Sequence, residues 1–144
     1  MGRILAIDYG LRRTGLAVTD PGRIIATGLD TVATGDLLNY LIKYTATNDV
    51  DIIVVGMPLQ MDGSASESQR HIVPFIGRLK KRFPDIAVET ADERFTSVLA
   101  KRAMIEGGVS KSGRRDKGLV DKVSAVIILQ GYMESRQQLK NDEL

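Results

Sequence analysis

Short runs of apolar, often β-branched residues separated by turn-forming residues fill the first part of the chain. Two such runs cover Arg3–Asp8 and Arg13–Thr19, and an Asp-Pro-Gly sequence at positions 20–22 separates the second run from a third over Arg23–Leu29. Asp, Pro and Gly each favour tight turns, and apolar runs of this length between turns are typical of strands. We therefore expect a meander of three antiparallel strands.

Beyond this meander the apolar spacing alternates between helical and strand-like. The run Asp51–Gly56 is apolar without alternation, which predicts a parallel strand covered on both faces, and Ile86–Ala91 predicts another strand. Helical spacing predicts a first helix over Gly35–Thr47, with Thr34 as its N-cap. A second helix should end at about Arg82, and Pro74 should either kink it or mark its true start. Two further helices are predicted over Phe95–Ile105 and Leu119–Gln137.

This order of elements predicts an α/β fold. Because crossovers between parallel strands are right-handed, we expect a five-stranded mixed sheet, three antiparallel strands followed by two parallel ones, with helices on both faces. A length of 144 residues without a repeat or linker fits one domain over residues 1–138, followed by a frayed tail over residues 139–144. No apolar run approaches the ~20 residues that cross a bilayer, and the start lacks a signal peptide, so we expect a cytoplasmic protein without membrane association.

Composition narrows the chemistry that the chain can support. It has no cysteine and one histidine, which excludes disulfides, thiolate zinc sites and cysteine nucleophiles, and leaves oxygen atoms as the ligands of any metal. Such ligands favour Mg²⁺ or Mn²⁺. The formal net charge of +2 does not by itself indicate a nucleic-acid partner.

Three acidic residues occur where apolar elements end or begin. Asp8 ends the first strand, Glu93 follows the strand Ile86–Ala91, and Asp121 lies in the predicted first turn of an apolar helix. Taken singly, each also fits a structural role, because aspartates start turns and acidic residues favour helix N-termini. If they converge, they would repel one another unless divalent cations were present. Two cations ~3.5–4 Å apart could then activate a water and stabilise the leaving oxygen of a phosphodiester.

Four motifs in sequence resemble one known family. They are DYGLRRTGLA at positions 8–17, GMPL at 56–59 followed by DGS at 62–64, DERFTS at 92–97, and DKVSAV at 121–126. Together they resemble the YqgF (RuvX) family, relatives of the RuvC Holliday junction resolvases, over nearly the whole chain. The departures are small: Phe95 replaces a more usual leucine, and Pro74 interrupts a helix.

The resemblance implies a ribonuclease H-like fold and a nuclease that trims the 5′ end of the 16S ribosomal RNA precursor. By the motifs, Asp8 would bridge two Mg²⁺ or Mn²⁺ ions, while Glu93 and Asp121 would each complete a ligand set. In the family's Asp-Glu-Arg motif the glutamate is the acidic site residue, which selects Glu93 over Asp92.

Basic residues flank these acids in the sequence. Arg12 and Arg13 follow Asp8, and Lys111, Arg114, Arg115 and Lys117 lie in the predicted mobile loop Val109–Gly118. Basic side chains beside an acidic metal site suit a polyphosphate substrate, although a solvated loop would have the same composition. We expect nucleic acid as the partner, and we favour precursor rRNA over branched DNA. We expect the protein to be a monomer or a weak homodimer.

Three other functions are compatible with this pattern. The first is a Holliday junction resolvase, which normally requires a symmetric dimer to cut two strands. The second is a phosphate-binding module of the actin and sugar-kinase type, which shares an Asp-x-Gly loop but closes two such domains around its nucleotide. The third is a non-catalytic nucleic-acid-binding module, against which the retention of all three acids argues.

Overall fold

The computed structural model describes residues 2–58, 69–93, 105, 107–108 and 116–142, with the side chains of 93 and 137–142 left out. The elements in chain order are β1 (Arg3–Asp8), β2 (Arg13–Thr19), β3 (Ala26–Ala33), a short 3₁₀ helix η1 (Thr34–Asp36), α1 (Leu37–Thr47), β4 (Val50–Pro58), α2 (Gln69–Arg82), β5 (Ala87–Glu93) and α5 (Lys117–Asp142). The predicted helix Phe95–Ile105 lies outside the described residues, Ile105 apart.

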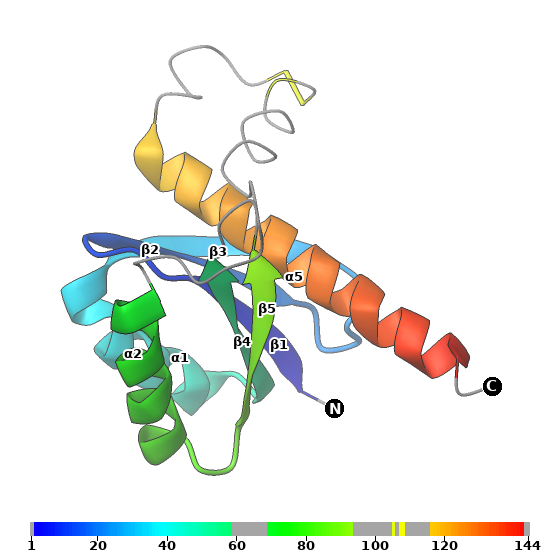
Figure 1. Cartoon of the computed structure of the whole chain (residues 1–144), viewed down its shortest axis with the longest axis horizontal. Coiled ribbons are helices and arrows are strands. Elements are labelled where there is room, and N and C mark those ends of the chain that lie inside the picture. Colours follow the sequence, from blue (N-terminus) through cyan, green and yellow to red (C-terminus); the bar gives the residue numbers. More distant parts are fainter. Residues whose placement is uncertain (1, 59–68, 94–104, 106, 109–115, 143–144) are drawn as a thin grey trace.

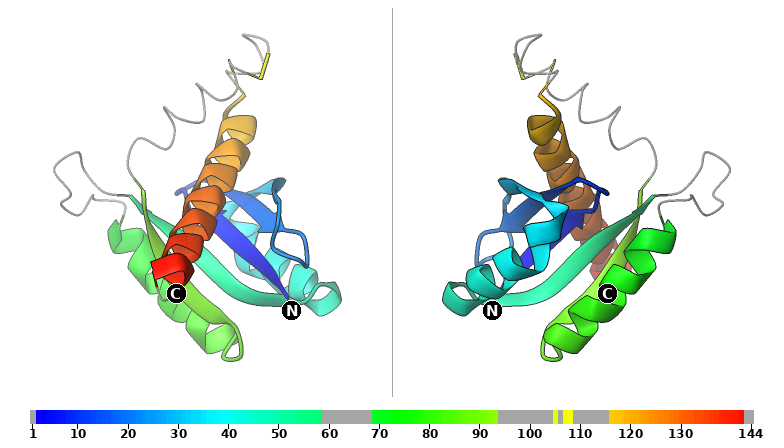
Figure 2. Two further views of the ribbon diagram at one scale, coloured as in Figure 1. Left: turned by 90° about the vertical axis from the view of Figure 1, so that its right-hand side faces the viewer. Right: turned by 90° about the vertical axis from the view of Figure 1, so that its left-hand side faces the viewer.

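The five strands form one mixed sheet in the order β3-β2-β1-β4-β5. The pairs β1/β2 and β2/β3 are antiparallel, and the pairs β1/β4 and β4/β5 are parallel. Helices α1 and α2 cover one face of the sheet and α5 crosses the other (Figures 1 and 2). The predicted α/β architecture is therefore confirmed.

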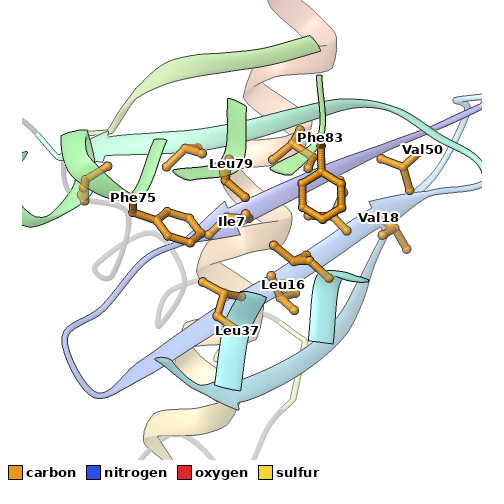
Figure 3. Close-up of a cluster of buried hydrophobic side chains, with 13 residues drawn as sticks. Ile7, Leu16, Val18, Leu37, Val50, Phe75, Leu79 and Phe83 are labelled. Carbon is orange, nitrogen blue, oxygen red and sulfur yellow. The ribbon is translucent and has the colours of Figure 1, made fainter. Parts of the chain in front are cut away.

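Two apolar clusters, one on each face, hold the helices on the sheet. Successive residues of a strand point to opposite faces. Leu5 and Ile7 of β1 accordingly belong to the cluster under α1 and α2, which Figure 3 shows, while Ile4 and Ala6 belong to the cluster under α5. β4 behaves in the same way. This explains why Asp51–Gly56 is apolar without alternation: both of its faces are covered.

The turn between β2 and β3 is longer than the sequence predicted. The carboxylate of Asp20 accepts hydrogen bonds from the backbone N–H groups of Ile24 and Ile25, both at 2.8 Å, and Arg23 has a positive φ of 58°. These bonds extend the turn through Ile25. Strand β3 therefore begins at Ala26, and the predicted strand start at Arg23 was wrong.

The predicted cap at Thr34 was also wrong. Its hydroxyl donates to the carbonyl oxygen of Gly10 at 2.6 Å instead. The residues that precede η1 and α1 are Ala33 and Asp36, and neither makes a side-chain capping bond. Pro74 lies inside α2, so the helix begins before it.

Helix α5 is longer at both ends than predicted. It begins at Lys117, because a carboxylate oxygen of Asp116 accepts a hydrogen bond from the N–H of Leu119 at 3.2 Å. It continues to Asp142, so positions 139–142, which we expected in a frayed tail, are helical. None of the helices in the described part of the chain is long and apolar enough to cross a membrane.

Candidate functional site

Asp8 marks the edge of the sheet where the candidate site is built. It is the last residue of β1, it is partly buried, and it pairs with Gly15 of β2. Because β1, β4 and β5 are parallel, their carboxyl ends meet at this edge, which is where open α/β sheets place their sites. Asp8 also shares the α5 face with Ala6, since residues two apart on a strand point the same way.

Helix α5 brings Asp121 to the same edge. A Cβ atom on Gly15 would lie 2.0 Å from the carbonyl oxygen of Asp121, so only glycine lets the helix backbone approach β2 this closely. Farther out, the side-chain stem of Lys122 lies over Gly28 of β3, and the hydroxyl of Thr31 donates to the carbonyl of Gly118. Because Gly15 is the partner of Asp8, the structure brings Asp8 and the Asp121 backbone together.

The environment of Asp121 argues against a purely structural role at a helix end. α5 carries no acidic residue in its first turn, because it starts earlier than predicted and Asp116 caps it. The favourable dipole interaction is confined to that first turn. Instead, Oδ2 of Asp121 accepts a hydrogen bond from Nε of Arg13 at 2.9 Å. The carboxylate of Asp121 therefore forms an ion pair with the guanidinium group of Arg13.

The backbone of Glu93 ends β5 at the same edge, paired with Pro58 of β4. Its side chain lies outside the described residues. Asp92 is described and is exposed; since Ala91 packs in the cluster under α5, Asp92 belongs to the opposite face from Asp8. This geometry removes Asp92 as a neighbour of Asp8, and the choice of Glu93 stays a prediction.

The loop between β1 and β2 is held in a fixed shape beside these acids. A Cβ on Gly10 would lie 2.3 Å from the carbonyl oxygen of Arg13, and Thr34 bonds the loop through both its side chain and its backbone N–H, which donates to the carbonyl of Arg12 at 2.9 Å. Arg12 is exposed, as is Lys117 at the start of α5. The other predicted nucleic-acid-binding residues, Lys111, Arg114 and Arg115, lie outside the described residues.

Ser124 is a polar residue of this region that the sequence analysis did not single out. Its side chain is 1% exposed, and its hydroxyl has no hydrogen-bond partner within the described part of the chain. It lies one helical turn from Asp121. The available signal was its position, since serine interrupts an otherwise apolar run in a helix expected to be buried.

Among the residues whose side chains are described, no three acidic or imidazole groups gather closely enough to hold a metal ion. That set contains Asp8 and Asp121 but not Glu93. The structure thus brings two of the three predicted acids to one edge and places the backbone of the third on the same edge.

Comparison with known proteins identifies the family. Residues 2–135 match the family model RuvX, whose description is Holliday junction resolvase. The chain belongs to the RuvX family. A relative from Phocaeicola vulgatus is 55% identical over 139 residues, which is 96% of this chain and 100% of the relative. Another from Bacteroides thetaiotaomicron is 54% identical over 137 residues, 95% of this chain and 99% of the relative. Each is named "putative pre-16S rRNA nuclease".

A solved structure confirms the fold of this RuvX family chain. RuvC of T. thermophilus, in complex with a Holliday junction substrate, aligns with a TM-score of 0.58 and 16% identity, and the alignment covers 95% of this chain and 96% of RuvC. The expected ribonuclease H-like fold and the resemblance to the RuvX family are both confirmed.

Proposed function

We propose that this chain is a divalent-metal-dependent nuclease that hydrolyses phosphodiester bonds and processes the 5′ end of the 16S rRNA precursor in the cytoplasm. The relatives named "putative pre-16S rRNA nuclease" match this chain over nearly their whole length. The observation on which the proposal depends is the seating of Asp121 on Gly15, the strand partner of Asp8. This contact joins Gly15 and Asp121, which are 106 positions apart in the sequence, at the edge where β5 also ends.

The donor set fits hard divalent cations. We propose that Asp8, Glu93 and Asp121 would hold two Mg²⁺ or Mn²⁺ ions. Neighbouring strands lie ~4.8 Å apart, so the backbones of Asp8 and Glu93 are separated by about 10–12 Å, a gap that two acidic side chains and a pair of ions can span. The ion pair of Asp121 with Arg13 supports this assignment, because it places a positive group against the same carboxylate.

The chemistry divides between the ions and the chain. When bound, the ions supply a water activated for attack and stabilise the leaving oxygen. The three carboxylates hold those ions in place. Arg12, Arg13 and Lys117 attract the phosphate backbone toward the acidic edge, and Lys111, Arg114 and Arg115 are proposed to extend this basic surface.

Cleavage assays with paired acid variants test the proposal. Labelled 16S rRNA precursor, linear DNA and a four-way junction are incubated with Mg²⁺ or Mn²⁺ and with wild type, Asp8→Asn, Glu93→Gln or Asp92→Asn. We expect precursor cleavage near the mature 5′ end, a loss of ~100-fold or more in the first two variants, and near-normal activity in Asp92→Asn, because Asp92 lies on the other face. Equal loss in Asp92→Asn, or activity that persists in Asp8→Asn, would refute the assignment.

A Holliday junction resolvase is the second candidate, because the family description names that activity. The same substrate panel separates the two functions: preferential, paired incision of the four-way junction would favour the resolvase. That activity normally requires a symmetric dimer, whereas rRNA processing is compatible with the monomer or weak homodimer that we propose. Analytical ultracentrifugation of the wild type distinguishes these states.

A further inference from the structure

Arg13 forms an ion pair with Asp121, one of the carboxylates that would bind a divalent cation in the proposed function. Nε of Arg13 lies 2.9 Å from Oδ2 of Asp121. Arg13 begins β2, and its backbone belongs to the loop that Gly10 and Thr34 hold in place. The contact is therefore a feature of the fold that joins β2 to α5, two elements far apart in the sequence.

We propose that Arg13 is an exchangeable counter-ion, which neutralises Asp121 until a divalent cation takes that carboxylate and then contacts a phosphate of the bound nucleic acid. This inference rests on the proposed function. Arg13 thus has two successive partners, whereas its position in the sequence indicated the nucleic acid alone.

The exposure of the pair favours exchange. The side chains of Arg13 and Asp121 are 42% and 24% exposed, so solvent screens their attraction, and pairs of this kind contribute little to stability. A divalent cation bound by several carboxylates can therefore displace the guanidinium at small cost. A fully buried pair would be much harder to separate, because each charge would lose its only compensation.

Like-charge repulsion gives the exchange its direction. Once a cation sits on Asp121, the Arg13 guanidinium faces a positive charge only a few ångströms away. A phosphate beside the cation supplies the negative charge that restores a favourable site for Arg13. Cation binding and nucleic-acid binding should then strengthen each other, and this coupling must be reciprocal.

The test compares two neighbouring arginines. Mn²⁺ is titrated by calorimetry into wild type, Arg13→Gln and Arg12→Gln without nucleic acid. Arg12 is exposed in the same loop, so its variant controls for the general loss of one positive charge. We expect Arg13→Gln to bind Mn²⁺ two- to fivefold more tightly than Arg12→Gln, because Arg13, rather than Arg12, pairs with Asp121.

A second measurement follows the nucleic acid. Affinity for a short precursor RNA is measured in EDTA and in Ca²⁺, which stands in for Mg²⁺ to limit cleavage. We expect Ca²⁺ to tighten RNA binding by wild type and Arg12→Gln several-fold more than binding by Arg13→Gln. Thermal unfolding checks each variant. If Arg13→Gln does not fold, Arg13→Met, which removes the charge but keeps an unbranched side chain, takes its place and should also bind Mn²⁺ more tightly than Arg12→Gln.

The outcomes separate this inference from the proposed function. Equal or weaker Mn²⁺ binding by Arg13→Gln than by Arg12→Gln, with a wild type that binds Mn²⁺ and cleaves RNA, would overturn the exchange and leave the nuclease intact; it would mean that Arg13 merely positions Asp121. A wild type that binds no Mn²⁺ would overturn both.

Discussion

At the scale of single residues, the buried hydroxyl of Ser124 destabilises the folded state, whereas its apolar neighbours on α5 do not. Its hydroxyl is buried without a hydrogen-bond partner in the described part of the chain, and it sits between apolar residues that pack on the sheet. Transferring a hydroxyl from water to such a site without a partner costs roughly 1–3 kcal/mol. Thr19 offers a contrast, because its equally buried hydroxyl accepts a hydrogen bond from the N–H of Ile4 at 2.9 Å.

Two substitutions of buried hydroxyls should therefore change stability in opposite directions. We expect Ser124→Ala to raise the free energy of unfolding by about 1 kcal/mol, since it removes an unpaired polar group. Thr19→Val should lower it by roughly 1–3 kcal/mol, since it leaves a buried N–H without its partner. Urea unfolding followed by circular dichroism measures both. A Ser124→Ala variant less stable than wild type would mean that the hydroxyl has a partner.

The residue types of the site could be predicted, but their contacts could not. Asp8 and Asp121 stood out because carboxylates are rare beside apolar elements. The Arg13–Asp121 pair joins positions 108 apart in the sequence, and no local pattern reports such a contact. The capping prediction failed for the same reason: the Thr34 hydroxyl bonds the carbonyl of Gly10 and the hydroxyl of Thr14, which only the folded chain brings close.

At the scale of elements, the contact between α5 and the sheet determines where Asp121 lies. Gly15 and Gly28 provide the space for the helix backbone and for the stem of Lys122. The helix thus rests directly on two strands at the end where Asp8 lies, rather than on a layer of side chains. Any side chain at position 15 must push the helix, and Asp121 with it, away from Asp8.

Gly15→Ala should accordingly impair both stability and the site. The new methyl group would meet a backbone carbonyl that cannot rotate away, so we expect a loss of ~3 kcal/mol or more in the free energy of unfolding, together with weaker Mn²⁺ binding. Gly131→Ala, on the same helix, is the matched control. A Cβ there meets nothing within 4 Å, so it should stabilise by about 0.5–1 kcal/mol. Wild-type stability of Gly15→Ala would contradict the close approach.

The elements themselves were largely predictable, and the exceptions have local causes. The apolar run of β4 and the helical spacing of α1 predicted these elements and their buried faces correctly, because burial follows directly from the positions of apolar residues. Strand β3 was placed three residues too early. Asp20 accepts hydrogen bonds from two backbone N–H groups, and Arg23 adopts a positive φ, which is rare for residues other than glycine. The turn therefore includes residues 23–25, whose sequence is typical of a strand.

At the scale of the whole molecule, α5 links the site to the far edge of the sheet. Its first turns lie over β2 and β3, and farther along the helix the hydroxyl of Tyr132 donates to a carboxylate oxygen of Glu89 on β5. Arg136 donates in turn to the Tyr132 oxygen at 2.9 Å. One helix therefore ties both edges of the sheet together, including the strand that ends at Glu93 (Figure 1).

This link should make global stability sensitive to alkaline pH. Burial, and then the hydrogen bond to Glu89, raise the pKa of Tyr132 above its ordinary value of 10.0. A pKa raised by folding means that the protonated phenol stabilises the native state. That contribution is fully present below the unfolded-state pKa near 10 and is lost as the pH rises through the higher native-state pKa.

Tyr132→Phe removes this contribution at every pH. We expect the variant to be less stable than wild type by about 1 kcal/mol near pH 8, where the phenol donates its hydrogen bond. Above about pH 10 the wild type should lose stability faster than the variant, because the phenol of Tyr132 ionises at a lower pH in the unfolded state than in the native state, so the difference should shrink. Urea unfolding at several pH values measures the differences, and a gap between wild type and Tyr132→Phe that stays constant or widens above pH 10 would show that this hydroxyl does not link α5 to β5.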